Sequence, residues 1–278
     1  MTLLARPSGG LLTRLAEFRA QPSGMRWAFA RTVVDYLDPK GSVERLLWRL
    51  MPETPREKVR EAVREALSDA DLLSVVRHRA ETPGLLSPRE MVFLHALVLI
   101  TRPEIVVETG VAHGSSSVAL LSALRKNRYG RLYSIDLPMV ERDGSIESPE
   151  GTCSLDLSET TVLPSFERVG WLVGEDLRSR WELHLGDSLR LLPGLLSRVG
   201  RVDLFLHDSL HRYAHMYGEF QQVWPYLREG GILLADDIFV FRHAAMADFA
   251  RSVGVPFLTY FGMGVMQKPK VRGEKRHP

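Results

Sequence analysis

Two observations in the sequence predict an α/β fold built on a mostly parallel β-sheet. From residue 105 onward, short apolar runs of strand length recur, and most are followed by a turn residue and then by a helical pattern. This alternation is typical of parallel strands joined by helices. Residues 256–261 and 263–267 differ, because they meet directly at Gly262 and predict an antiparallel hairpin that closes the sheet.

The first predicted strand, residues 105–107, runs into a glycine-rich turn. After the strand the sequence reads ETGVAHGSSS, and a helical pattern follows over residues 118–124. Gly110 and Gly114 permit a sharp turn and let a ligand lie against the main chain, while the first turn of a helix offers unpaired N–H groups. The turn therefore predicts a small-molecule site, although an ordinary strand-to-helix connection can have the same composition.

The spacing of these glycines disfavours two common nucleotide-binding loops. A dinucleotide fingerprint needs a third glycine, and Ala112 occupies its middle position. A phosphate-binding P-loop needs a Gly-Lys-Ser or Gly-Lys-Thr sequence, which does not follow the turn. Pyrophosphate is therefore not the favoured ligand, and a nicotinamide oxidoreductase is the weaker alternative.

The next predicted strand, residues 131–135, ends at an acidic residue. Asp136 follows the glycine turn by one helix and one strand, which is where folds of this type bind ribose hydroxyls with a carboxylate. A solvated turn residue before Pro138 is the simpler alternative. Only the position of Asp136 relative to the glycine turn favours a binding role.

A third unit of strand and helix repeats this plan. Residues 181–185 form a strand pattern, Asp187 and Ser188 follow after a glycine, and a helix is predicted over residues 189–196. Asp and Ser are good helix N-caps, because their side chains accept hydrogen bonds from the first N–H groups of the helix. The pair can therefore cap the helix and face a ligand at the same time.

Acidic side chains also end the two strands that follow. Asp208 comes after the buried run 202–206, and Asp236 with Asp237 ends the run 230–235. In a parallel sheet these strand ends lie at one edge, where three unpaired carboxylates would repel one another and their pKa values would rise. A divalent cation removes that repulsion, and all-oxygen ligands favour Mg²⁺, Ca²⁺ or Mn²⁺ over zinc. The sequence therefore predicts a hard metal ion here, with solvated helix caps as the alternative.

His211 is the candidate general base. It stands three residues beyond Asp208, and a neutral imidazole is well matched to remove a proton from a hydroxyl near pH 7. His207, His211 and His215 are spaced by four residues, but a zinc site is disfavoured because His207 belongs to the strand end and no HExxH motif is present. His113 and His215 are expected to be structural.

Five motifs occur in order within residues 85–268: ETGVAHGSSS, LYSIDLP, LHLGDS, DLFLHDSLH and LLADDI. Together they resemble the class I S-adenosylmethionine-dependent methyltransferases. Within this class they are similar to the metal-dependent O-methyltransferase type, near macrocin O-methyltransferase and the cephalosporin hydroxylase-like proteins. The resemblance implies a Rossmann-like, seven-stranded, mostly parallel sheet with an antiparallel last strand. It also implies methyl transfer from S-adenosylmethionine to a hydroxyl of a small-molecule acceptor, with Mg²⁺ or another hard divalent cation.

The same resemblance implies roles for individual residues. S-adenosylmethionine would be bound by residues of the glycine turn and of the following strand ends: Glu108, Gly110, Gly114, Ser115, Asp136, Asp187, Ser188 and Asp208. The metal ion would be held by Asp208, Asp236 and Asp237, and the catalytic pair would be Asp208 and His211. One departure follows the acidic pair, where Phe239 and residues 240–242 replace an expected polar residue and imply a more apolar acceptor pocket.

The N-terminal part of the chain predicts a helical annex over residues 1–85. Helical patterns cover residues 11–19, 25–36, 43–50 and 55–67. A further helix over residues 87–101, with Ser87 as N-cap and Pro88 in its first turn, leads into the catalytic domain of residues 86–268. By analogy, the annex is expected to cover the site or to form the interface of a homo-oligomer.

Two segments show little of the apolar periodicity that predicts helices or strands. Residues 139–170 are rich in Ser, Glu, Thr and Gly, and we expect a long loop that serves as a lid over the acceptor. Residues 269–278 are basic and lack apolar periodicity, and we expect a flexible, solvated tail.

Composition restricts the remaining choices. The chain has 278 residues, 45% hydrophobic and 25% charged, with a net charge of +2, so it can bury a sizeable core and has no charge excess that favours nucleic acid. A single cysteine, Cys153, excludes an internal disulfide and is consistent with the cytoplasm. The longest apolar run, residues 91–100, is too short to span a membrane, and a signal-peptide pattern is absent.

Two further alternatives to a methyltransferase stay open. A hydroxylase-like enzyme on the same fold would use the carboxylates with an oxidisable metal. A non-catalytic scaffold would use the annex for assembly, although the presence of Asp208, His211, Asp236 and Asp237 favours an enzyme. The acceptor itself depends on the shape of the pocket, which the sequence does not give.

Overall fold

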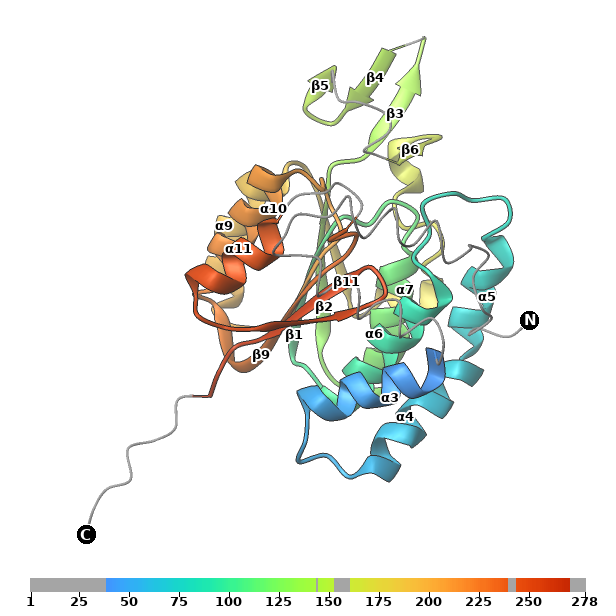
Figure 1. Cartoon of the computed structure of the whole chain (residues 1–278). Helices are drawn as coiled ribbons and strands as arrows, with labels where there is room; N and C mark the ends of the chain where they lie inside the picture. Colours follow the sequence, from blue (N-terminus) through green and yellow to red (C-terminus); the bar gives the residue numbers. More distant parts are fainter. Residues whose placement is uncertain (1–38, 144, 153–160, 240–243, 271–278) are drawn as a thin grey trace, which may run out of the picture.

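The computed structural model describes residues 39–143, 145–152, 161–239 and 244–270, and its main element is a twisted sheet (Figure 1). The strands of this sheet are β1 (Ile105–Thr109), β2 (Arg131–Asp136), β7 (Trp181–Leu185), β8 (Val202–His207), β9 (Leu227–Ala235), β10 (Phe257–Tyr260) and β11 (Met263–Gln267). Their order is β10-β11-β9-β8-β1-β2-β7. The seven-stranded α/β fold implied by the sequence is confirmed.

The directions of the strands are also as predicted. Strands β7, β2, β1, β8 and β9 pair in parallel, whereas β11 pairs antiparallel with both β9 and β10. The hairpin of β10 and β11 turns through Phe261 and Gly262, with Phe261 in the left-handed region at φ 52°. The sheet is therefore mostly parallel and contains an antiparallel last strand.

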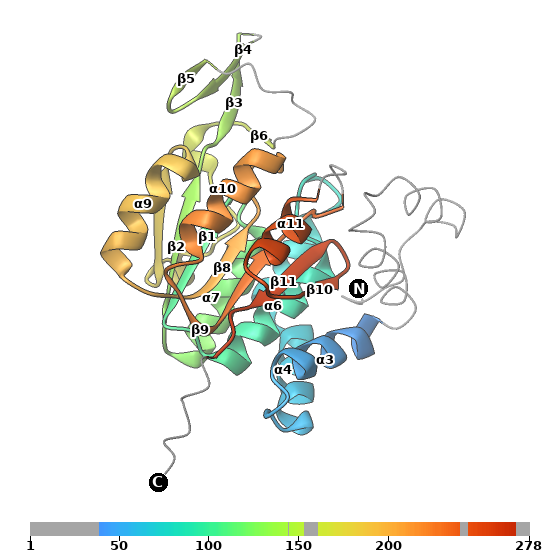
Figure 2. The same ribbon diagram turned by 60° about the vertical axis from the view of Figure 1, so that its left-hand side comes forward.

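Helices cover both faces of the sheet (Figures 1 and 2). One face carries α3 (Pro39–Leu50), α4 (Arg56–Ser68), α5 (Ala70–His78), α6 (Pro88–Thr101) and α7 (Ser115–Asn127), and the other carries α9 (Ser188–Val199), α10 (Tyr213–Val223) and α11 (Ala245–Ser252). Side chains alternate along each strand, so that Val106 packs in the first layer and Val107 in the second. Burial on both faces explains why these strands are nearly continuous apolar runs.

The helix α6 joins the N-terminal helices to the sheet. Ser87 is its N-cap and Pro88 occupies the first turn, as the sequence predicted. Ser87 accepts a hydrogen bond from the N–H of Glu90, and the Glu90 side chain accepts one from the N–H of Ser87, which completes a capping box that the sequence analysis did not include. Side chains on all sides of α6 are buried, because it packs against α4 and α7 and lies in the same apolar layer as one face of the sheet. In the described part of the chain, no helix is both long enough and apolar enough to span a membrane.

The helices predicted over residues 43–50 and 55–67 are confirmed by α3 and α4, and α5 is an additional helix that the sequence did not predict. Its N-cap Asp69 accepts hydrogen bonds from the N–H groups of Asp71 and Leu72. The helices predicted over residues 11–19 and 25–36 lie outside the described residues. The side chains of α3, α4 and α5 share one apolar layer with α6, α7 and the sheet.

The prediction of a structureless loop over residues 139–170 is wrong for the described part of this segment. It forms a second sheet in the order β5-β4-β3-β6, which projects from the main body in Figure 1. Its strands are β3 (Met139–Arg142), β4 (Ser145–Ser148), β5 (Gly151–Thr152) and β6 (Val162–Leu163), followed by a 3₁₀ turn (Phe166–Arg168) and the short helix α8 (Glu175–Arg178). Strands this short pair only with one another, so they leave little periodicity in the sequence. Most of the predicted basic tail, residues 271–278, lies outside the described residues.

We expect Phe93→Ala to lower the free energy of unfolding by about 3–5 kcal/mol. Phe93 on α6 is fully buried, and its ring lies 5.3 Å from that of Tyr260 on β10. Urea denaturation measures the change. The matched control is Leu185→Ala on the edge strand β7, where the side chain is 43% exposed and the loss should stay below about 1 kcal/mol. Equal losses in the two variants would contradict the assignment of α6 to the core.

Candidate functional site

The glycine turn lies in close backbone contact with the end of β8. Gly110 has φ 84°, and a Cβ atom at this position would lie 2.0 Å from the main-chain oxygen of Asp208. Gly114 has φ 93° and is the N-cap of α7, where a Cβ atom would lie 2.9 Å from the Cα of Gly170. Both positions therefore need glycine for space as well as for conformation.

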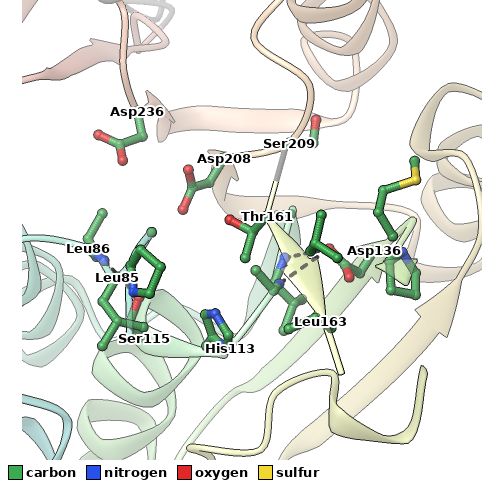
Figure 3. Close-up of a pocket in the computed structure, with 18 of the residues that line it drawn as sticks. Leu85, Leu86, His113, Ser115, Asp136, Thr161, Leu163, Asp208, Ser209 and Asp236 are labelled. Carbon is green, nitrogen blue, oxygen red and sulfur yellow. Dashed lines mark hydrogen bonds between the residues drawn. The ribbon is translucent and has the colours of Figure 1, made fainter. Parts of the chain in front are cut away.

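A cavity of about 1140 Å³ opens at the carboxyl ends of β1, β2, β8 and β9. Most of the predicted site residues line it: Gly110, Ser115, Asp136, Asp187, Ser188, Asp208, His211, Asp236 and Asp237. Figure 3 shows Asp208 and Asp236 facing the same space, with Asp136 farther along the cavity. The topology thus brings the glycine turn and the acidic strand ends into one site.

Asp136 holds the glycine turn in place. Its carboxylate accepts hydrogen bonds from the N–H groups of Val111 at 2.8 Å and of Ala112 at 3.4 Å (Figure 3). Burial raises the pKa of Asp136 to about 6, although these two hydrogen bonds act in the opposite direction. The side chain is therefore not a solvated turn residue, and it is ionised at neutral pH.

Glu108 and Gly114 are the predicted cofactor residues that do not line the cavity. Glu108 is fully buried behind the turn, and its carboxylate accepts hydrogen bonds from the hydroxyls of Ser117 and Ser134, each at 2.7 Å. Burial raises its pKa above the ordinary value, although the serine hydroxyls lower it. In this structure Glu108 joins β1 to α7 and β2, and a contact with a cofactor stays a prediction.

The predicted helix cap at the third strand end is confirmed. Asp187 is the N-cap of α9 and accepts a hydrogen bond from the N–H of Leu189 at 2.8 Å. The hydroxyl of Ser188 is turned toward the buried carboxylate of Glu219 and lies 2.9 Å from His215 Nε2. Asp187 and Ser188 also line the cavity, so the capping role leaves both residues beside the ligand space.

Four carboxylates gather at the other end of the cavity. A Cβ atom at Gly262 would lie 3.3 Å from Glu90 Oε1 and 3.7 Å from both Asp236 Oδ1 and Asp237 Oδ1. Asp208 interacts electrostatically with Glu90 and with both of these aspartates. Glu90 was not predicted as a site residue. Its spacing from Ser87 gives the signal of a capping box, but its position beside Asp237 depends on how α6 packs.

Burial raises the pKa of each of these four carboxylates, and the charge of Asp237 raises the pKa values of Glu90 and Asp208 further. The charges of Glu90 and Asp237 do the same for Asp236. Asp236 Oδ1 is buried and has no hydrogen-bond partner among the described residues. Such a cluster needs protons or a cation to neutralise it.

The donor set of this cluster fits a hard cation, since every donor is a carboxylate oxygen. Within the described residues, however, no group of three or more His, Cys, Asp or Glu side chains is arranged so that it could hold a metal ion. The chemistry of the cluster therefore supports the predicted metal site, while ligation by Asp208, Asp236 and Asp237 stays a prediction.

The candidate base His211 lies beside this cluster. Its Nε2 is 3.8 Å from Asp208 Oδ1, and its ring packs on that of His207 at a centroid distance of 5.2 Å. His113 and His215, expected to be structural, both line the cavity. His113 Nδ1 accepts a hydrogen bond from Trp171 Nε1 at 2.9 Å.

Two segments from outside the predicted motifs complete the wall of the cavity. One side of the cavity is lined by the segment that follows α5, residues 79 and 81–87. Another side is lined by residues 161–164 around β6. The first segment comes largely from the predicted annex and the second from the predicted lid. The stretch 240–242, from which a more apolar acceptor pocket was expected, lies outside the described residues.

Comparison with known proteins agrees with this geometry. A family model described as a methyltransferase domain matches residues 107–238, which include the glycine turn and the acidic strand ends. This stretch of the chain is therefore similar to a methyltransferase domain. No curated protein matches the sequence.

Two solved structures with a similar fold illustrate the class. A methyltransferase from Podospora anserina with bound S-adenosylhomocysteine aligns with a TM-score of 0.51 at 14% identity, over 73% of this chain and 89% of that chain. An O-methyltransferase from Bacillus cereus, also in complex with S-adenosylhomocysteine, aligns with a TM-score of 0.50 at 15% identity, over 73% of this chain and 92% of that chain. At this identity the likeness establishes the fold alone.

We expect Gly110→Ala to destabilise the protein, because the left-handed backbone alone costs about 1–3 kcal/mol and the added Cβ would meet the carbonyl of Asp208. Thermal and urea unfolding measure the loss. The matched control is Gly194→Ala in α9, where a Cβ atom meets nothing within 4 Å and alanine should leave the stability equal or higher. A neutral Gly110→Ala would contradict the close contact between the two loops.

Proposed function

We propose that this protein is an S-adenosylmethionine-dependent methyltransferase that methylates a hydroxyl group of a small molecule with the help of a divalent cation. The observation that carries the proposal is a single cavity with the glycine turn and Asp136 along one part and the carboxylate cluster at another. The part around the glycine turn and Asp136 suits a nucleoside that carries an amino acid. The part around the carboxylate cluster suits a cation and an acceptor oxygen. The matched methyltransferase domain supports the first half of this proposal.

The cofactor would lie between the glycine turn and the ends of β2 and β7. Asp136 would accept hydrogen bonds from the ribose hydroxyls, and Asp187 with Ser188 would face the adenine. Gly110 and Ser115 would present main chain to the other end of the cofactor, with Gly114 shaping the turn and Glu108 supporting it from behind. Asp208 would approach the cofactor from the neighbouring strand end, because its main chain already touches Gly110.

The metal ion would be held by Asp208, Asp236 and Asp237. Glu90 is close enough to contribute charge to the same place. When bound, a divalent cation would lower the pKa of the acceptor hydroxyl. The raised pKa values of the cluster and the unpartnered Asp236 Oδ1 support this role.

When bound, S-adenosylmethionine would supply its methyl group to the acceptor oxygen by displacement at the methyl carbon and would leave as S-adenosylhomocysteine. The hydroxyl proton passes to the imidazole of His211, which lies beside Asp208. The main contribution of the protein is to hold the donor carbon and the acceptor oxygen in line within the cavity.

The first test is binding of S-adenosylhomocysteine, measured by isothermal titration calorimetry, with NAD at millimolar concentration as the comparison. Binding of S-adenosylhomocysteine without binding of NAD supports the proposal. Absence of S-adenosylhomocysteine binding would remove it in favour of a scaffold, and oxygen consumption without methyl transfer would favour the hydroxylase-like alternative.

We expect Asp208→Ala, or a strong chelator, to abolish turnover and to remove binding of Mn²⁺ detected by electron paramagnetic resonance. The control is Asp248→Asn on α11, because Asp248 pairs with Arg251 and does not line the cavity. Full activity in EDTA would contradict the metal-dependent part and leave the methyltransferase part standing.

We also expect the affinity for S-adenosylhomocysteine to fall by up to about tenfold between pH 7 and pH 5, the factor by which the ionised fraction of a group with pKa 6 decreases. Burial raises the pKa of Asp136 to about 6, and protonation turns one acceptor of the carboxylate into a donor and weakens its hydrogen bonds with the ribose hydroxyls. Titration calorimetry across this range measures the step. Asp136→Asn should bind more weakly and show no such step, and an unchanged pH dependence in that variant would assign the step to another group.

A further inference from the structure

A second buried carboxylate, Glu219 on α10, lies beneath the cavity and has no assigned role. Its side chain is fully buried. Burial raises its pKa, but the charges and hydrogen bonds of His207 and His215 outweigh this effect and lower the pKa well below the ordinary value. Glu219 is therefore a buried anion, which requires strong compensation by its neighbours.

Five side chains supply that compensation. Oε2 accepts hydrogen bonds from Thr109 Oγ1 at 2.6 Å and His207 Nδ1 at 2.7 Å. Oε1 accepts them from Ser209 Oγ at 2.8 Å and His215 Nε2 at 3.0 Å, and also from the hydroxyl of Ser188. The carboxylate is thus saturated with donors, in contrast to the cluster around Asp236.

Four of the five donors come from three loops that form the site, and the fifth, His215, stands on α10 with Glu219. Thr109 ends β1 and immediately precedes Gly110 of the glycine turn. Ser188 begins α9 at the third strand end and lines the cavity, and His207 and Ser209 stand on either side of Asp208. One anion therefore connects the glycine turn, the loop before α9 and the end of β8.

We propose that Glu219 is the positioning residue of the cofactor site, which fixes these three loops relative to one another through four of its five hydrogen bonds. Glu219 acts through Thr109, Ser188 and the neighbours of Asp208 rather than by touching the ligand. The inference rests on the proposed binding of S-adenosylmethionine at this cavity.

Strand β8, which carries the donor His207, also offers a matched control. Asp203, at the opposite end of β8, is also buried and accepts hydrogen bonds from the N–H groups of Glu104 and Ile105 at 3.0 and 2.8 Å, and from Arg228. It joins β8 to the start of β1 far from the carboxyl ends of the strands. A loss of stability without a loss of binding is therefore expected for Asp203→Asn.

The experiment compares Glu219→Gln and Asp203→Asn with the wild type. Binding of S-adenosylhomocysteine is titrated by calorimetry at a temperature where urea and thermal unfolding show each protein folded. We expect the dissociation constant to rise at least tenfold in Glu219→Gln and to change less than twofold in Asp203→Asn. Folded Glu219→Gln that binds within twofold of the wild type would overturn the inference. A wild type that does not bind at all would overturn the proposed function, and this inference with it.

A second measurement separates positioning from general packing. Burial lowers the pKa of His215, but its hydrogen bond and charge interaction with Glu219, together with the charge of Asp187, raise it above the ordinary value. Nuclear magnetic resonance of the histidine rings should show a lower pKa for His215 in Glu219→Gln and an unchanged one in Asp203→Asn. An unchanged titration in both variants would contradict the contact between Glu219 and His215.

If Glu219→Gln does not fold, Thr109→Val decides the question. Valine keeps the shape and strand preference of threonine but removes one donor to Glu219. We expect a folded protein with a dissociation constant for S-adenosylhomocysteine raised about threefold or more. Unchanged binding in Thr109→Val would overturn the inference.

Discussion

The organising constraint of this molecule is that parallel strands deliver their acidic ends to one edge of the sheet, where the carboxylates are buried and must be neutralised. Three of them are served by protein donors. Asp136 accepts hydrogen bonds from two N–H groups of the glycine turn, and Glu219 accepts them from five side chains. Glu108 accepts serine hydroxyls at Oε2, while its Oε1 has no partner among the described residues. In the cluster around Asp236, four carboxylates lie together and their charges raise one another's pKa values. The demand for neutralisation is therefore greatest at this cluster.

The helices before the sheet contribute to the acidic site as well as to the apolar core. Glu90, on α6, places its carboxylate beside Asp236 and Asp237 while the same side chain closes the capping box with Ser87. The segment after α5 then forms part of the cavity wall. Packing in the apolar layer of α3 to α7 is therefore coupled to the geometry of the site, since a shift of α6 would move a charge within the acidic cluster.

Most of the fold and of the candidate site could be predicted from the sequence, wherever the local sequence pattern determines the position of a residue. The glycine turn, Asp136, Asp187 and the acidic pair each follow a strand, and strand ends converge by topology alone. Glu90 and Glu219 could not be placed in this way, because each stands within a helix and its role depends on which strand end the helix packs against. The small sheet of β3 to β6 escaped prediction for another reason. Its strands span two to four residues and pair only with one another. Strands this short do not produce a recognisable alternation of apolar and polar residues.

The electrostatics also weigh against a non-catalytic scaffold. Replacing Asp236 or Asp208 by an uncharged residue would relieve repulsion among the four carboxylates whose pKa values are raised. Glu219, by contrast, shows that the chain can saturate a buried anion with donors a short distance away. The repulsion among the carboxylates at the cavity carries a stability cost, which the proposed binding of a cation and an acceptor oxygen would explain.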